Sequence, residues 1–142
     1  MSCTVTQPKV SGNQSEIYQD SNFTLNETNI NLIERSLNIL DLKEYLHFEL
    51  PDRLPLRLEY DALNNSSEDY IIDCFGHPVK IIKSQNSANE GSKIDLVYAY
   101  QDLEKTDLVF RYPVEGIKLT VSFEFNDDFK SWNIASKKIV EY

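Results

Sequence analysis

The sequence predicts an α+β fold, in which one N-terminal amphipathic helix packs on an antiparallel sheet of six to seven strands. Apolar residues first recur at helical spacing, and after Pro51 they alternate with polar residues, as they do along half-buried strands. Turn residues then return about every 8–12 residues, which is typical of a sandwich, a half-barrel or a strongly curved sheet. Strands and helices do not alternate along the chain, so a parallel doubly wound sheet is excluded.

The chain has 142 residues, which suits one domain with its own core. Residues 1–22 are polar and rich in Ser, Asn and Gln, so we expect a flexible or loosely docked N-terminal arm there. Residues 23–142 are expected to form a single α+β domain. The Phe and Tyr side chains supply apolar surface for its core, and Trp132 is expected to join them.

The predicted helix covers residues 26–50, where Asn26 or Thr28 can cap its first turn. Pro51 ends it, because proline is not accepted inside a continuing helix. The apolar face contains Ile30, Ile33, Leu37, Leu40 and, after a small phase shift, Leu42 and Leu46, while Glu34, Arg35, Asn38, Asp41 and Glu44 point outward.

The strands are predicted from alternation and from the turns between them. Residues 53–60 alternate cleanly, and Pro55 favours an edge position for this strand because proline cannot donate to a ladder. The sequence Gly-His-Pro after Phe75 indicates a hairpin turn, and Pro-Val-Glu-Gly at 113–116 indicates a type I turn. The remaining predicted strands are 70–75, 79–83, 94–100, 107–112, 117–125 and 132–142.

The composition is acidic, with 23 acidic and 14 basic side chains and a net charge of −9. Because phosphate binding depends on clustered Lys and Arg, this argues against nucleic acid and anionic membranes as partners. It favours a basic protein as partner through charge complementarity and faster encounter. The simpler interpretation is that the negative charge only keeps the protein soluble.

The two cysteines, Cys3 and Cys74, show no CxxC spacing, so we expect free thiols in a reducing, cytoplasmic compartment. Cys74 lies among apolar residues and is expected to be buried. No apolar run reaches the ~20 residues of a membrane span, and the start of the chain resembles no signal peptide.

Motifs for metal binding or catalysis are weak. A calcium loop starting at Asp61 fails, since Leu63, Ser66 and Ile72 occupy positions that require oxygen ligands or glycine. Two alternatives stay open, a looser calcium site and a zinc site that includes a Cys-x-x-His pair. No phosphate-binding glycine loop or nucleophile motif is present, so we expect no cofactor, no metal and no enzymatic activity. The residues of these alternatives are Asp61, Asn64, Asn65 and Asp69 for calcium, and Cys74 and His77 for zinc.

The segment from Glu59 to Asp73 is the strongest candidate site, because it holds five carboxylates and no Lys or Arg. A solvated acidic loop of this kind can bind cationic side chains, and tyrosines beside it can serve as anchors. The predicted partner-binding residues are Glu59, Tyr60, Asp61, Glu68, Asp69, Tyr70 and Asp73.

This profile of small size and acidic charge is similar to that of immunity proteins of bacterial competition systems and of some antitoxins, although no motif identifies a family. The similarity implies an inhibitor that occludes the basic active-site groove of a toxin. One alternative is an accessory β-rich ligand-binding or sensor module of a phage or defence system, with a pocket between helix and sheet. The other is a carboxylate-based hydrolase. Strand order and oligomeric state cannot be predicted from these patterns.

Overall fold

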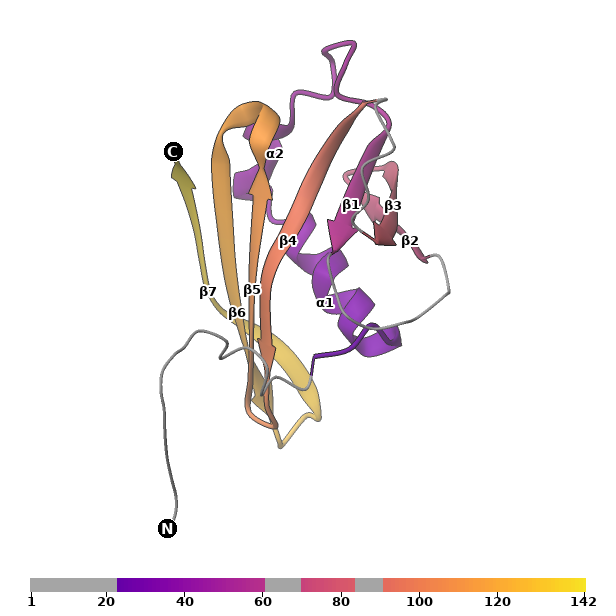
Figure 1. The fold of residues 1–142 in the computed structure, drawn as a ribbon. Coiled ribbons are helices and arrows are strands. Elements are labelled where there is room, and N and C mark those ends of the chain that lie inside the picture. Colours follow the sequence, from indigo (N-terminus) through magenta and orange to yellow (C-terminus); the bar gives the residue numbers. More distant parts are fainter. Residues whose placement is uncertain (1–22, 61–69, 84–90) are drawn as a thin grey trace, which may run out of the picture.

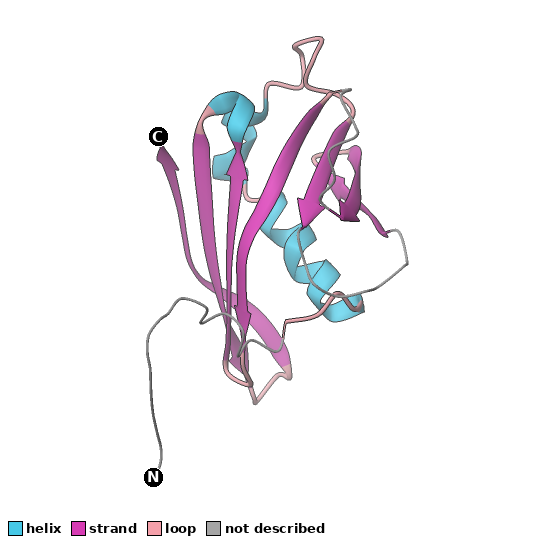
Figure 2. Cartoon of the chain, viewed as in Figure 1, coloured by secondary structure: helices cyan, strands magenta, loops and turns pink. Residues whose placement is uncertain are grey.

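The computed structural model describes residues 23–60, 70–83 and 91–142, and shows one curled, half-barrel sheet with two helices on one face (Figure 1). In these residues the helices precede the strands, and the α+β class and β-rich character are confirmed (Figure 2). The elements are α1 (Glu27–Leu37), α2 (Leu40–Leu46), β1 (Leu56–Tyr60), β2 (Tyr70–Cys74), β3 (His77–Lys83), β4 (Ser92–Gln101), β5 (Lys105–Tyr112), the 3-10 turn η3 (Pro113–Glu115), β6 (Ile117–Asn126) and β7 (Ser131–Glu141). The predicted arm, residues 1–22, lies outside the described residues.

The sheet is mixed, so the prediction of an antiparallel sheet is wrong. Its strand order is β2-β3-β1-β4-β5-β6-β7, and β1 runs parallel to both of its neighbours. The prediction that Pro55 marks an edge strand is also wrong, because β1 lies inside the sheet. Pro55 precedes the first ladder residue, Leu56, and its missing N–H therefore interrupts no bond of the ladder.

The segment 26–50, predicted as one helix, forms two helices, α1 and α2. Of the two predicted caps it is Asn26 that caps α1, since its Oδ1 accepts a hydrogen bond from the backbone N–H of Asn29 at 2.9 Å. The helical path breaks after Leu37, and Leu40, predicted on the apolar face, is 72% exposed. The break turns Leu42 and Leu46 toward the core, so the phase shift in the pattern marks a real interruption.

Asn38 lies at this break and joins α1 to the outermost strand, β2. Its Nδ2 donates to the backbone oxygens of Glu34 at 2.7 Å and Asp73 at 2.6 Å, and its Oδ1 accepts from the N–H of Phe75 at 2.7 Å. The N–H of Asp73 donates to Oε2 of Glu34 at 2.7 Å. Asn38 therefore bonds the last turn of α1 and, together with Glu34, covers the edge of β2 at Asp73.

We expect Asn38→Ala to lower the free energy of unfolding by about 1–3 kcal/mol, because it leaves several backbone groups without their partners. Asn38→Asp keeps an acceptor for Phe75 but loses both donors, and should lie between the wild type and the alanine variant. Urea unfolding followed by circular dichroism measures the difference. An alanine variant as stable as the wild type would show that water replaces these bonds without loss.

The β2–β3 hairpin is confirmed, with a tighter turn than predicted. Cys74 pairs with His77, so the loop contains only Phe75 and Gly76, at φ values of 49° and 88°. Positive φ at both positions is characteristic of a type I′ turn, whose twist matches that of the strands. His77 and Pro78 belong to β3 and not to the turn.

The core lies between the helices and the face of the sheet that they cover. Cys74 is buried there as predicted, and its Sγ donates to the backbone oxygen of Leu37 at 3.3 Å. Trp132 on β7 is half-buried, packs against this core and meets Phe125 edge to face, with ring centroids 5.2 Å apart. The other face of the sheet carries the alternate, mainly polar residues of the strands.

Candidate functional site

Glu59 does not lie outward and unpaired as the acidic-segment hypothesis requires. It is 5% exposed, and its Oε2 accepts a hydrogen bond from Nε of Arg57 at 2.8 Å. Nζ of Lys93 on β4 lies 3.8 Å from its other oxygen. Because β1 is an inner strand, its polar residues lie between neighbouring strands, and the charge of Glu59 is neutralised within the sheet.

Tyr60 and Tyr70, the predicted anchors, both pack against the core from partly buried positions. The ring of Tyr60 meets Phe23 edge to face at 6.3 Å, and burial raises the pKa of its phenol. Each tyrosine therefore has only part of its ring available to a partner.

Asp73 is exposed, but it also stabilises the hairpin, since its Oδ2 accepts from the N–H of Gly76 at 3.1 Å. The other three predicted carboxylates, Asp61, Glu68 and Asp69, lie outside the described residues, as do Asn64 and Asn65 of the alternative calcium site. Their part in recognition stays a prediction. The described residues thus do not bring the acidic segment together as one surface.

Exposed carboxylates occur instead on the helices and on the loop that follows α2. Between Glu27 and Arg53 the chain has six acidic and three basic side chains. The side chains of Asp41 and Asp52 are 64% and 74% exposed, whereas those of Asp95 and Glu115 are 24% and 19% exposed and pair with Lys93 and Arg53. We call Glu27, Asp41, Glu44, Glu49 and Asp52 the helix-side acidic surface.

Sequence reasoning placed recognition further along the chain and missed this surface, although its signal was present. Glu34, Asp41 and Glu44 occupy the outward positions of the helical pattern. The acidic segment 59–73 drew attention because it lacks bases. Whether a carboxylate forms an ion pair depends on which strands become neighbours, and a local sequence pattern cannot predict that.

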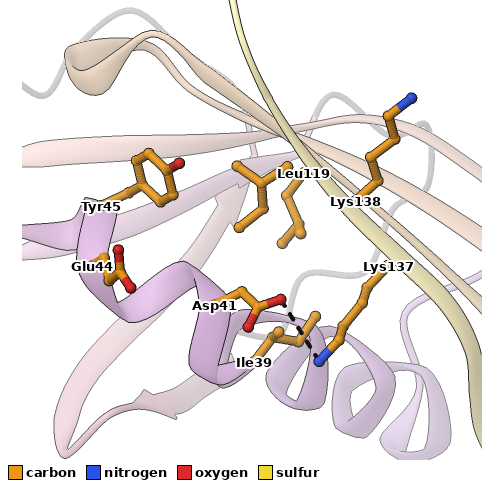
Figure 3. A pocket seen from close by; sticks show the side chains of 8 residues that line it. Ile39, Asp41, Glu44, Tyr45, Leu119, Lys137 and Lys138 are labelled. Atoms are coloured by element: carbon orange, nitrogen blue, oxygen red, sulfur yellow. Dashed lines mark ion pairs between the residues drawn. The ribbon is translucent and has the colours of Figure 1, made fainter.

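A groove of about 310 Å³ separates α2 from the end of β7 (Figure 3). Ile39 and Leu119 line it, Asp41 and Glu44 lie on its helix side, and Lys137 points into it from β7 (Figure 3). Nζ of Lys137 is 3.9 Å from Oδ2 of Asp41. The groove therefore has a mainly polar lining, with opposite charges on its two sides.

A second groove, of about 440 Å³, lies between α1 and the start of β7. Glu27, Arg35 and Trp132 line it, and Nη1 of Arg35 donates to the backbone oxygen of Trp132 at 2.9 Å. The helices therefore leave open space on both sides of the place where Arg35 meets β7.

The core itself contains only a small void of about 10 Å³, which is lined by Leu37, Phe110 and Leu119 among others. That volume suits no more than about one water molecule, which leaves no ligand pocket there.

The described residues include no group of three or more His, Cys, Asp or Glu side chains that could hold a metal ion. Burial raises the pKa of the Cys74 thiol to about 12, so it is protonated at neutral pH. His77 packs edge to face on Phe48, with centroids 4.6 Å apart. Cys74 and His77 face each other across the hairpin, yet the thiol faces the core and bonds Leu37, which does not suit a zinc ligand.

The fold and this surface define an α+β domain with a curled mixed sheet and an acidic helical side. Comparison with protein-family models, with curated proteins and with solved structures found no match to this chain. Across the parts of the chain that the structure describes, no helix is long and apolar enough to cross a membrane.

Proposed function

We propose that this chain is a protein-binding domain that recognises a basic partner and inhibits it, in the manner of an immunity protein or antitoxin. The uneven exposure of its carboxylates is the observation that supports the proposal. On the sheet, Glu59, Asp95 and Asp107 are largely covered and pair with Lys or Arg. On the helix-side acidic surface, Asp41 and Asp52 stay 64% and 74% exposed, although each also lies near one base. Exposed charges of one sign attract a cationic partner over a distance of about 10 Å at ordinary salt.

Inhibition would follow from occlusion. A toxin that acts on nucleic acid needs a cationic groove for phosphate, and exposed carboxylates can fill the same groove. The carboxylates on the helices are held by a rigid backbone, so binding costs little conformational entropy beyond that of the carboxylate side chains themselves. The partner is defined here by its chemistry alone, as a protein with a basic cleft.

The first step of the test is affinity capture from a lysate of the source cells at low and high salt, followed by purification of the basic protein retained. Stopped-flow mixing then gives the association rate constant for the wild type and for Glu44→Lys/Glu49→Lys. We expect the variant to associate at least about tenfold more slowly at low salt, with a smaller difference at high salt. The wild type should also inhibit the partner's activity.

Asp127→Lys/Asp128→Lys is the matched control, because it changes the same charge at exposed positions in the turn between β6 and β7. If both double variants associate equally slowly, the net charge of the protein alone sets the association rate and no defined surface is involved. Unchanged rates for Glu44→Lys/Glu49→Lys would contradict the proposal.

The sensor alternative depends on a different observation, the groove between α2 and β7. A thermal shift with metabolites and none with a basic protein would favour it.

A further inference from the structure

The two outer strands of the sheet differ in how their free edges are closed. On β2, the N–H and C=O of Asp73 are both bonded by side chains, those of Glu34 on α1 and of Asn38 just after it. On β7, within the described residues, β6 is the sole strand partner along a length of 11 residues. An unprotected edge of this length is a template for another strand.

The first half of β7 is partly protected. Arg35 bonds the carbonyl of Trp132, and the register with β6 shifts so that Ala135 is an extra residue, which makes a bulge. Bulges twist an edge and hinder pairing. Beyond the bulge the register with β6 is regular from Ser136 to Glu141. The open, regular edge is therefore the segment Lys137–Glu141.

The hydrogen bonding of β7 decides which backbone groups of this segment are free. The N–H of Tyr142 donates to the backbone oxygen of Gly116 at 2.8 Å, on the β6 side. Residues alternate between the two sides of an antiparallel strand. The N–H and C=O groups of Lys137, Ile139 and Glu141 therefore point to the open edge, while those of Lys138 and Val140 bond β6.

We propose that this edge pairs with the same segment of a second copy of the chain, in antiparallel register about Ile139. The sequence Lys-Lys-Ile-Val-Glu at 137–141 is complementary to itself in that register. Lys137 lies opposite Glu141 of the second copy, Lys138 opposite Val140, and Ile139 opposite Ile139. Cross-strand pairs of opposite charge and of β-branched residues stabilise a sheet.

Neighbouring registers are less favourable. The two copies are related by a twofold axis perpendicular to the sheet, so the register changes in steps that keep each residue on its own face. One step places Lys138 opposite Lys138, and like charges directly opposite are destabilising. A step the other way places Ile139 opposite Glu141. Only the register about Ile139 pairs lysine with glutamate.

The side chains on the helix-facing side support the same register. Ile139 pairs with the core residue Leu119 on β6, is only half-buried, and lines the groove beside α2. The second Ile139 would lie next to it and cover it, while Asp41 stays beside Lys137. The contact is short, so we expect a dissociation constant on the order of micromolar.

Sedimentation velocity of the full chain over a range of concentrations should show a reversible monomer–dimer equilibrium. Lys137→Glu and Glu141→Lys each place like charges opposite one another, and each should raise the dissociation constant at least about tenfold. The double variant Lys137→Glu/Glu141→Lys restores opposite charges and should return to within about threefold of the wild type. Lys80→Glu, on β3 and away from this edge, is the control and should leave the constant unchanged.

Amide hydrogen exchange gives a second readout that does not need a variant. At low concentration the amides of Lys137, Ile139 and Glu141 should exchange fast and those of Lys138 and Val140 slowly. At high concentration the first three should become protected. A protein that stays monomeric at all concentrations would overturn the inference. So would a dimer whose dissociation constant is unchanged by both charge reversals, or one whose dissociation constant does not return toward the wild-type value in the double variant.

Discussion

Gly91→Ala is expected to lower the free energy of unfolding by at least about 4 kcal/mol, or to prevent folding altogether. A Cβ on Gly91 would lie 1.9 Å from the backbone oxygen of Pro55, and its φ of +70° is unfavourable for alanine. The N–H of Ser92 donates to the same oxygen at 3.1 Å. This close approach starts the parallel pair of β1 and β4, so neither backbone can move away without loss of the pair.

Gly76→Ala is the matched control, because Gly76 also has a positive φ, of 88°, but has open space where the Cβ would be. It should cost about 1–2 kcal/mol, the penalty for the backbone conformation alone. Chemical denaturation monitored by tryptophan fluorescence compares the two. If both variants lose the same stability, the approach of Gly91 to Pro55 has no energetic role.

Leu58→Ala should lower the free energy of unfolding by about 2–5 kcal/mol. Leu58 is fully buried in β1, with Ile81 and Ile94 opposite it on the two neighbouring strands. Removing its side chain leaves a cavity that these strands cannot close, since the backbone of an inner strand is held on both sides.

Leu103→Ala makes the same chemical change at a residue that is 89% exposed in the turn between β4 and β5, and should alter stability by less than about 0.5 kcal/mol. Differential scanning calorimetry measures both variants against the wild type. A small effect at Leu58 would mean that β1 contributes little to the core, contrary to its inner position in the sheet.

Local patterns predicted most of the secondary structure. Alternation placed all seven strands within a few residues, and turn residues placed the β2–β3 hairpin and the turn before β6. These patterns succeed because they report the periodicity of each element and the backbone freedom of the residues between elements. The cap at Asn26 and the burial of Cys74 were predictable for the same reason.

The helix was predicted less well, because hydrophobic periodicity does not distinguish a small phase shift from a break. Asn38 makes the difference. Its side chain bonds Asp73 and Phe75, residues 35 and 37 positions away in the sequence. An interruption of the helix that distant backbone groups stabilise leaves no local signal other than the shift itself.

The candidate site was predicted only in its chemistry. The acidic composition and the outward positions of Asp41 and Glu44 were readable, and both belong to the helix-side acidic surface. The segment 59–73 was predicted to bind a partner because it contains no Lys or Arg. In the structure, however, Glu59 forms ion pairs with Arg57 on its own strand and with Lys93 on β4. Neutralisation of a charge depends on its neighbours in space, and composition cannot supply them.

By itself, the sequence determined the α+β class, the approximate positions of the strands, the position of the tight hairpin and the sign of the charge. These depend on residues close together in the chain. Only the tertiary structure decided that β1 lies inside a mixed sheet, that Glu59 is neutralised and that β7 has β6 as its sole strand partner among the described residues. Strand order is set by long-range burial of apolar faces, and each strand's own pattern is compatible with several orders.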